Sequence, residues 1–386
     1  VLKEPVPEKR VSLLPEHIAG FTKLNCKVFI ERGAGNNACT SDENYLQSGA
    51  NIVSREEVLE QAQIILSINA LNDDALKQCK AKILLGTYNA LLNTAVIQKC
   101  AAANFSVFSM EMLPRTTRAQ SMDVLSSQAN IAGYKAVLLA ANLYPKYFPM
   151  FMTAAGTIPP AKVLVLGAGV AGLQAIATAK RLGAVIEVFD TRPAVKEEVM
   201  SLGGKFIEVE GAADASKAGG YAVEQSQDFL QRQKEKIAES VAKADIIITT
   251  AQIPGKKAPV LISNEMLAAM KNGSVIVDLA AATGGNTAQT QNEKTIVYHG
   301  ITIAGNSLLA GDMPADASKL YGKNILNFLQ LIIDKEGNLN LNFEDDLVKG
   351  TCVAHEGRIT NEKYIKLHFS AAANHLYHYP HDICGH

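Results

Sequence analysis

The sequence predicts an α/β protein made of two Rossmann-like, parallel-sheet domains separated by a cleft. Short apolar runs typical of buried strands alternate with helical stretches along most of the chain. In the middle, "VLVLGAGVAGLQAIATAKRLGAVIEVFDTRP" (163–193) places a glycine-rich turn between a strand and a helix. The length of 386 residues allows two domains that each bury a core.

The elements can be placed in order along the chain. The first domain should contain strands at 27–31, 64–68 and 82–86. A long helical segment follows from about Ser121 to Ala141, and after it we expect a proline-bounded loop that begins near Pro145. The second domain should contain strands at 162–167, 185–190, 245–250, 274–279 and 301–305.

The last long apolar stretch at helical spacing, 318–334, follows the final strand of the second domain. We expect it to be a helix that returns to the first domain, which makes that domain discontinuous. The predicted boundaries are therefore 1–120 plus 320–386 for the first domain and 121–319 for the second.

Composition excludes several classes of protein. Hydrophobic residues make up 48% and charged residues 19%, and the net charge of -1 gives no basic excess for nucleic acid. No apolar run reaches the ~18 residues that span a bilayer. The six cysteines show no CxxC pair, so we expect reduced thiols in a cytoplasmic protein.

The glycine-rich turn has the features of a dinucleotide site. Gly167 allows the tight turn, Gly169 lets the backbone approach a pyrophosphate, and Gly172 lets helix and strand pack closely. The N–H groups at the start of the helix then face the phosphates. We expect the cofactor to contact Gly167, Ala168, Gly169, Val170, Ala171 and Gly172.

An acidic residue ends the next strand and favours one cofactor. Asp190 lies eighteen residues beyond Gly172, close to the ~20 expected for a carboxylate that binds the adenosine ribose. It can accept a hydrogen bond from a 2′-hydroxyl and repels a 2′-phosphate, so NAD(H) is favoured over NADP(H). Thr191 and Arg192 follow, and Arg192 could instead accommodate a phosphate or remain solvated.

A second polar segment, "MEMLPRTTRAQSMDVLSSQANIAGYKAV" (110–137), precedes and enters the long helix. It gathers Arg115, Arg118, Gln120 and Asp123 within nine residues. Ligand clefts of α/β proteins form at the carboxyl ends of strands and between domains, so this loop is a candidate wall of such a cleft. A solvated loop at a helix start is the alternative.

Four stretches resemble the NAD(H)-binding component of proton-translocating nicotinamide nucleotide transhydrogenase. They are "PRTTRAQSMDVLSSQANIAGYKAV", "FPMFMTAAGTIPPAKVLVLGAGVAGLQAIATAKRLGA", "TTAQIPGKKAPVLI" and "NILNFL". The resemblance runs from residue 1 to about 360. It implies Si/Re-specific NAD(P)+ transhydrogenase activity. Hydride passes directly between NAD(H) on this chain and NADP(H) on a partner component, and a membrane component couples the transfer to proton translocation.

The resemblance also implies roles for particular residues. Arg115, Gln120 and Asp123 would shape the nicotinamide site, and Tyr221 in the loop 218–233 would close over the adenosine end. The matching stretch after the strand 245–250 adds Thr250, Ala251 and Gln252 to the cofactor contacts. A homodimer is implied, held to the inner membrane only through its partner subunits and active only with them.

Two other functions are considered. Alanine dehydrogenase shares the opening "LKEPVPEKRVSLLPE" but needs a lysine, a histidine and an acid, where this chain has Asn69, Asn89 and Ala282. None of these can exchange a proton in catalysis. A catalytically silent NAD-binding regulator is the second alternative, because Ala282 and the stretch 306–311 depart from the transhydrogenase pattern.

The histidine-rich tail after Thr360 does not match the transhydrogenase family. We expect a disordered or edge-packed tail and no metal site.

Overall fold

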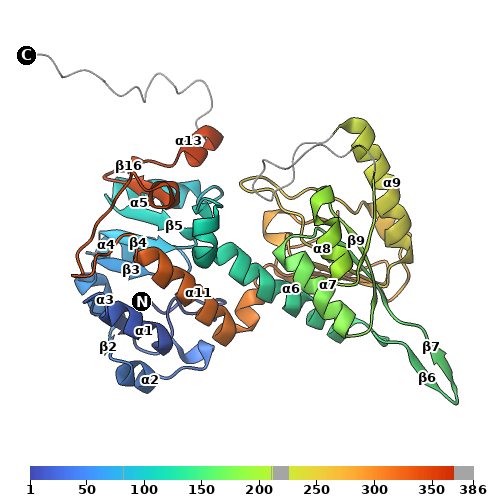
Figure 1. Ribbon diagram of the computed structural model, residues 1–386, viewed down its shortest axis with the longest axis horizontal. Coiled ribbons are helices and arrows are strands. Elements are labelled where there is room, and N and C mark those ends of the chain that lie inside the picture. The colour runs from blue at the N-terminus through green and yellow to red at the C-terminus, as the bar shows by residue number, and fades with distance from the viewer. Residues whose placement is uncertain (81, 210, 212–225, 369–386) are drawn as a thin grey trace, which may run out of the picture. The chain divides into compact units, whose positions relative to one another are not determined.

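The computed structural model describes residues 1–80, 82–209, 211 and 226–368 (Figure 1). It divides into two compact units. The first unit contains residues 1–124 and the described residues from 318 onward, and the second contains 125–317. Both are α/β units with largely parallel sheets, as the sequence predicts. The first is discontinuous, and its last segment enters within the long helix α11 (Pro314–Leu329).

The first unit is organised around a five-stranded sheet. The strand order is β16-β15-β5-β4-β3, and β3, β4 and β5 are parallel while β15 and β16 are antiparallel to their neighbours. A separate parallel pair, β1 and β2, lies outside this sheet. The strands are β1 Phe29–Glu31, β2 Asn51–Val53, β3 Ile64–Leu66, β4 Ile83–Gly86, β5 Ser106–Ser109, β15 Cys352–His355 and β16 Arg358–Ile359.

Both faces of this sheet are buried. Successive side chains of β4 point to opposite faces and pack into two different hydrophobic cores. Ile83 and Leu85 pack in one cluster and Leu84 in another. The helices of this unit are α1 Pro15–Thr22, α2 Asp42–Gln47, α3 Arg55–Gln61, α4 Asp73–Gln78, α5 Thr94–Ala102, α11, α12 Asp346–Thr351 and α13 Glu362–His368.

The second unit contains a seven-stranded sheet in the order β10-β9-β8-β11-β12-β14-β13. Its strands are parallel except β13, which is antiparallel to β14. Without β13, this is the strand order of a dinucleotide-binding fold, in which the order reverses beside the first strand, here β8. The strands are β8 Lys162–Leu166, β9 Val185–Phe189, β10 Lys205–Phe206, β11 Ile246–Thr249, β12 Val275–Asp278, β13 Lys294–Tyr298 and β14 Ile301–Gly305.

The helices of the second unit again cover both faces of its sheet. Val163 and Val165 of β8 pack into one core, and Leu164 and Leu166 into the other. The helices are α6 Val124–Leu143, which starts at the unit boundary, α7 Val170–Arg181, α8 Lys196–Ser201, α9 Gln227–Lys243 and α10 Asn264–Ala268.

One local prediction is wrong, and one helix is confirmed with shifted bounds. The segment expected to be a proline-bounded loop contains a hairpin, β6 (Phe151–Thr153) and β7 (Gly156–Ile158), whose strands pair antiparallel across a two-residue turn. The helix expected at 318–334 is α11, which begins at Pro314 and ends at Leu329. Proline is favourable in the first turn of a helix, so the start is four residues earlier than the apolar pattern alone indicates.

The described part of the chain has no helix with the length and apolarity needed to cross a membrane. Its five cysteines, Cys26, Cys39, Cys79, Cys100 and Cys352, are all free thiols.

Candidate nucleotide site

The glycine-rich turn lies between β8 and α7 at the carboxyl edge of the second sheet. Gly167 has a φ of +103°, a conformation that side chains of L-residues rarely adopt. A Cβ on Gly172 would lie 1.9 Å from the Gly167 carbonyl oxygen, so only glycine allows this close packing. A Cβ on Gly169 would meet nothing within 4 Å. The space above Gly169 is therefore available to a ligand.

The first turn of α7 presents backbone N–H groups beside that space. Its N-cap is Gly169, and no side chain caps the helix. Val170 and Ala171 occupy the first helical positions, so their N–H groups can face an anion. The helix α6 supports this turn, because Gly133 approaches so closely that a Cβ there would lie 2.1 Å from the Ala171 carbonyl oxygen. The arrangement fits a pyrophosphate.

The Asp190 carboxylate follows β9 and already accepts four hydrogen bonds. Its Oδ2 accepts from the Ala168 N–H at 2.7 Å and from Arg192 Nη2 at 2.9 Å. Its Oδ1 accepts from the Arg192 N–H at 2.8 Å and from Arg192 Nε at 2.9 Å. The side-chain hydrogen bonds to Asp190 raise the pKa of the Arg192 guanidinium. Asp190 thus ties the glycine turn to β9, with Thr191 half-buried beside it.

A second loop at the same edge carries Thr250, Ala251 and Gln252, which follow β11. The Thr250 hydroxyl donates to the Gly167 carbonyl at 3.0 Å, and the Gln252 amide donates to the Leu279 carbonyl at 3.0 Å. The predicted residues of the two loops are therefore adjacent in this unit.

Sequence reasoning missed the residues that hold this second loop. The Asn286 amide accepts from the Ala251 N–H at 3.0 Å and donates to the Ala251 carbonyl at 2.8 Å. Asp278, fully buried at the end of β12, accepts from the Asn286 N–H at 2.6 Å and from the Thr290 hydroxyl at 2.6 Å. The sequence signal was available, because Asp278 ends a fully apolar strand run at the carboxyl edge.

The polar segment before α6 forms a turn in the first unit. Arg115 lies on the exposed loop that leads into the 3₁₀ turn η3 (Thr117–Met122), which carries Gln120, and Asp123 directly follows. Within the described residues, the exposed Gln120 side chain makes no hydrogen bond, whereas Arg115 and Asp123 both have polar partners. An amide that donates and accepts is thus presented to solvent.

Two predicted features lie outside the described residues. Tyr221 is one, and the part of the loop that is described forms the start of α9, capped by Ser226. The other is the tail beyond His368, which contains most of the histidines of the histidine-rich segment. His368 itself donates from Nε2 to the Leu91 carbonyl at 2.8 Å.

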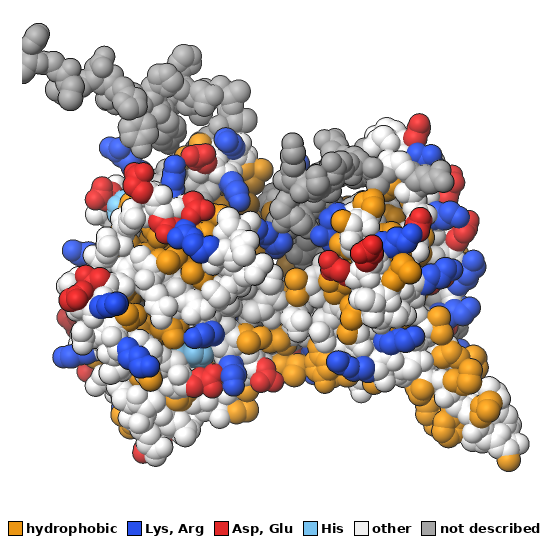
Figure 2. Space-filling view, in the orientation of Figure 1, with side chains coloured by type: hydrophobic (Ala, Val, Ile, Leu, Met, Phe, Trp, Pro, Cys, Tyr) orange, Lys and Arg blue, Asp and Glu red, His pale blue; other side chains and the backbone are white. Residues whose placement is uncertain are grey.

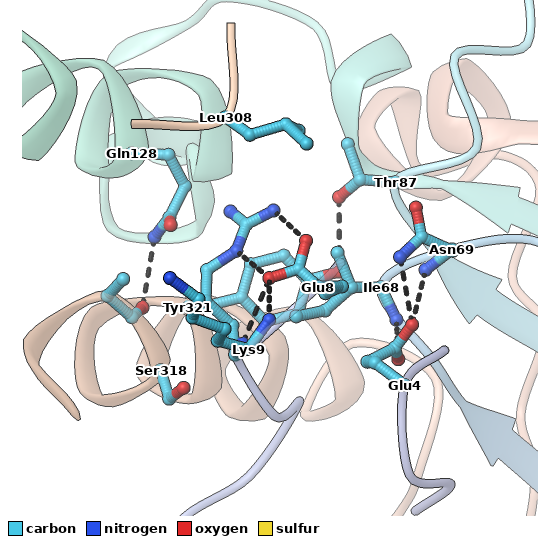
Figure 3. A network of polar contacts seen from close by, with 12 residues as sticks. Glu4, Glu8, Lys9, Ile68, Asn69, Thr87, Gln128, Leu308, Ser318 and Tyr321 are labelled. Atoms are coloured by element: carbon cyan, nitrogen blue, oxygen red, sulfur yellow. Dashed lines mark hydrogen bonds and ion pairs between the residues drawn. The ribbon is translucent and has the colours of Figure 1, made fainter. Parts of the chain in front are cut away.

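At the three positions where an alanine dehydrogenase needs a lysine, a histidine and an acid, the side chains of this chain play no acid–base role. Asn69 donates from its side-chain amide to Glu4 at 3.0 Å, and its backbone N–H and that of Ile68 also donate to this buried carboxylate (Figure 3). Asn89 adopts a positive φ of 51° in a turn, and Ala282 is exposed in a 3₁₀ turn. No acid–base pair arises from these three positions.

Both halves of the chain match known family models. Residues 1–132 match the N-terminal domain of the alanine dehydrogenase/PNT family, and residues 136–362 match its C-terminal domain. The chain belongs to the alanine dehydrogenase/PNT family. A curated relative, an NAD(P) transhydrogenase alpha-subunit chain of Rhodospirillum rubrum, is 45% identical over 364 residues, which cover 92% of this chain and 95% of the relative.

Solved structures agree with that assignment. The crystal structure of transhydrogenase from Sinorhizobium meliloti matches with a TM-score of 0.84 and 43% identity, over 93% of this chain and 98% of that one. An L-alanine dehydrogenase matches with a TM-score of 0.79 but only 20% identity, over 95% of this chain and 98% of that one, and so shares the fold. At the sequence level this family member is similar to transhydrogenase alpha subunits.

Proposed function

We propose that this chain is the NAD(H)-binding component of a proton-translocating transhydrogenase. Hydride passes directly between NAD(H) on this chain and NADP(H) on a partner component, and a membrane component couples the transfer to proton movement. The observation that carries the proposal is the family match, at 45% identity to a transhydrogenase alpha-subunit chain over nearly the whole sequence. The exposed amide of Gln120 and the open space over Gly169 support it.

The glycine turn and its neighbours would hold the nucleotide. The N–H groups at the start of α7 face the pyrophosphate, Gly169 allows its close approach, and Thr250, Ala251 and Gln252 line the adjacent loop. Bound NAD(H) supplies the hydride chemistry through its nicotinamide ring.

NAD(H) rather than NADP(H) is the proposed cofactor of this chain. The side chain of Asp190 is only 7% exposed and is paired with Arg192, so the Arg192 charge is already neutralised. A 2′-phosphate would have to approach this carboxylate, which repels it, and would have to compete for Arg192. A ribose hydroxyl, being neutral, meets no such repulsion.

Arg115, Gln120 and Asp123 orient the nicotinamide in this proposal. The Gln120 amide can hydrogen-bond both the oxygen and the nitrogen of a carboxamide. Arg115 and Asp123, which precede and follow Gln120 in the sequence, supply opposite charges. None of the three needs to accept or release a proton, because hydride transfer between two rings requires positioning at near-contact distance.

Substitution of Gln120 tests this role. Gln120→Asn shortens the side chain by one methylene and keeps the amide, so it displaces the ring without removing a charge. We expect the hydride-transfer rate to fall by about 100-fold, because misplacement of reacting atoms by ~1 Å has that effect, while NADH affinity changes little. The measurement is stopped-flow mixing with the NADP(H)-binding component, alongside an NADH titration.

Gln47→Asn is the matched control, since Gln47 is an exposed amide of the same unit on α2. Deuterium at the transferred position of NADH should appear in NADPH without exchange with water. A wild-type chain that binds NADH but shows no hydride burst would favour the silent regulator. Loss of NADH affinity in Gln120→Asn with an unchanged burst would remove Gln120 from the nicotinamide site.

We also propose a homodimer, supported by the hairpin β6–β7 of the second unit. An isolated two-stranded hairpin is marginally stable in water, and this one pairs with no other strand among the described residues. Phe151 is nevertheless 44% exposed and Met152 71%. Figure 2 shows hydrophobic side chains gathered on the surface of this hairpin. Tyr147 stacks on Phe151 at 5.4 Å between ring centroids. Such a surface is typical of a protein interface.

The partners and location follow from the same proposal. The chain is cytoplasmic and reaches the inner membrane only through the NADP(H)-binding and membrane-spanning components. Sedimentation with membrane vesicles should therefore require those components. Sedimentation of the isolated chain with protein-free vesicles would contradict this.

A further inference from the structure

The turn that carries Arg115 and Gln120 consists of the 3₁₀ turn η3 and the exposed loop that leads into it. At the ends of this turn, backbone N–H groups donate from Thr116 to the Pro114 carbonyl at 3.1 Å, from Ala119 to that of Thr116 at 3.1 Å and from Asp123 to that of Gln120 at 3.4 Å. The hydrogen bonds of a 3₁₀ turn have poorer geometry than those of an α-helix, and the side chains from Arg115 to Arg118 are exposed. Local bonds alone therefore hold this turn weakly.

A charged clamp joins the turn to a segment more than 200 residues later. Arg118 Nη1 donates to Asp345 Oδ2 at 2.7 Å and Arg118 Nη2 to Asp345 Oδ1 at 2.5 Å, a bidentate pair, and Nη2 also reaches Asp346. Asp345 is the N-cap of α12 and accepts from the Leu347 N–H at 2.8 Å. The planar fork of an arginine fixes direction as well as distance.

Two further contacts come from the same C-terminal part of the first unit. Asn324 and Asn327 of α11 both donate from their side chains to the Ser121 carbonyl, each at 2.9 Å. Gly350 of α12 lies against Pro114, since a Cβ on Gly350 would lie 2.3 Å from the proline ring. The turn is thus held at Pro114, Arg118 and Ser121.

Two of the residues proposed to act on the nicotinamide lie between these three anchor points. Arg115 directly follows the first, and Gln120 lies between the second and the third. We propose that Arg118, held by Asp345 and Asp346, is a positioning residue that sets the places of Arg115 and Gln120 for hydride transfer. This inference rests on the proposed function of those two residues.

The clamp should affect rate more than stability. Arg118 is half exposed, and exposed ion pairs contribute little to folding. Positioning is different, because a shift of ~1 Å in reacting groups changes a rate by about 100-fold. Loss of the clamp should therefore leave the fold intact and loosen the turn.

The test compares Arg118→Gln, Asp345→Asn and the double variant with the wild type. Asparagine at 345 keeps an oxygen for the helix N-cap, so α12 should persist. Lys99→Gln is the matched control, because Lys99 forms an exposed ion pair with Asp73 at 2.9 Å elsewhere in the same unit. Hydrogen–deuterium exchange of peptides covering 114–123 is measured on the chain alone, with melting temperature and NADH affinity. The hydride burst is measured with the NADP(H)-binding component.

We expect faster exchange at 114–123 and a burst rate reduced at least about tenfold in both single variants, with NADH affinity within about twofold of wild type. The double variant should be no slower than Arg118→Gln, because both changes break one contact. Arg118→Lys, which keeps the charge but not the fork, should recover part of the rate.

The outcomes separate this inference from the function on which it rests. A wild type that transfers hydride, together with an Arg118→Gln variant that transfers it as fast as Lys99→Gln, overturns the positioning role alone. A rate loss matched by an equal loss of NADH affinity and a lower melting temperature also overturns it, because the contact is then structural. A wild type that transfers no hydride overturns the proposed function and the positioning role with it.

Discussion

Replacement of Gly169 by alanine separates nucleotide binding from folding. Gly169 caps α7 with a φ of -75° and extended backbone, which any L-residue adopts, and its added Cβ would meet nothing within 4 Å. Gly169→Ala should therefore leave the fold unchanged or stabilise it by about 0.4–1 kcal/mol, because alanine restricts the unfolded chain. The added methyl group instead occupies the space that a pyrophosphate needs.

The expected loss of affinity follows from the hydrogen bonds at stake. A bond from a backbone N–H to a charged phosphate is worth about 1.5–3 kcal/mol, and the methyl group should remove at least one of them. The NADH dissociation constant should then rise by about 10- to 100-fold. Gly172→Ala is the comparator, because its Cβ would lie 1.9 Å from a carbonyl oxygen. Overpacking of that kind costs ~1–3 kcal/mol of stability.

Urea unfolding and NADH fluorescence titration, both on the purified chain, measure the two effects. Gly169→Ala should unfold at or above the wild-type midpoint and bind NADH weakly, while Gly172→Ala should unfold at lower urea. If Gly169→Ala bound NADH with wild-type affinity, the pyrophosphate would not pass over this residue. If Gly172→Ala were as stable as wild type, the contact between Gly172 and the Gly167 carbonyl could widen without cost, which would contradict the close packing inferred there.

Three further predictions concern specificity, pH and assembly. Asp190→Ala should lower the preference for NADH over NADPH by at least about tenfold in paired titrations, because it removes the repulsive carboxylate and releases Arg192 toward a 2′-phosphate; equal ratios in variant and wild type would refute this. Burial lowers the pKa of His17, whose Nδ1 accepts from the Leu14 N–H at 2.9 Å. Its contribution to stability should be complete above about pH 6.5 and decline as the pH falls toward the folded-state pKa, so urea midpoints at pH 7.5 and 5.5 should differ less in His17→Gln than in wild type. Met152→Ser should shift the mass from dimer to monomer in light scattering at micromolar concentration, and an unchanged dimer would remove the hairpin from the interface.

The sequence predicts the second unit well because its strands are continuous apolar runs. β8, β9, β11, β12 and β14 all begin and end within about a residue of the expected positions. It misses β5 and β15, whose serine, cysteine and histidine residues interrupt the apolar pattern. The strand β5 is buried because it pairs with β4 on one side and with β15 on the other. Such pairing depends on residues distant in the chain, so no local pattern predicts it.

The site shows the same division between local and distant causes. The glycine turn and Asp190 follow from spacing, because each lies within one strand–helix–strand unit. The bonds from Arg192 to Asp190 do not, since a solvated arginine has the same sequence signature. Contacts such as Arg118 to Asp345, which span 227 residues, leave no periodic signal at all. The role of Gln120 at the nicotinamide stays a prediction, which the Gln120 and Arg118 variants test.

Two buried carboxylates, Glu4 in the first unit and Asp278 in the second, hold backbone loops, and this favours the proposed hydride transfer over proton chemistry. Glu4, whose pKa burial raises, accepts from the Ile68 N–H at 2.6 Å and from Asn69. Asp278 accepts from the N–H groups of Ala280 and Asn286 and thereby holds the loop after β11. A carboxylate engaged in this way cannot move a proton without breaking the loop that it holds. The exposed Gln120 amide can orient a ring but cannot titrate, and orientation is what the proposed transfer between two nicotinamides requires.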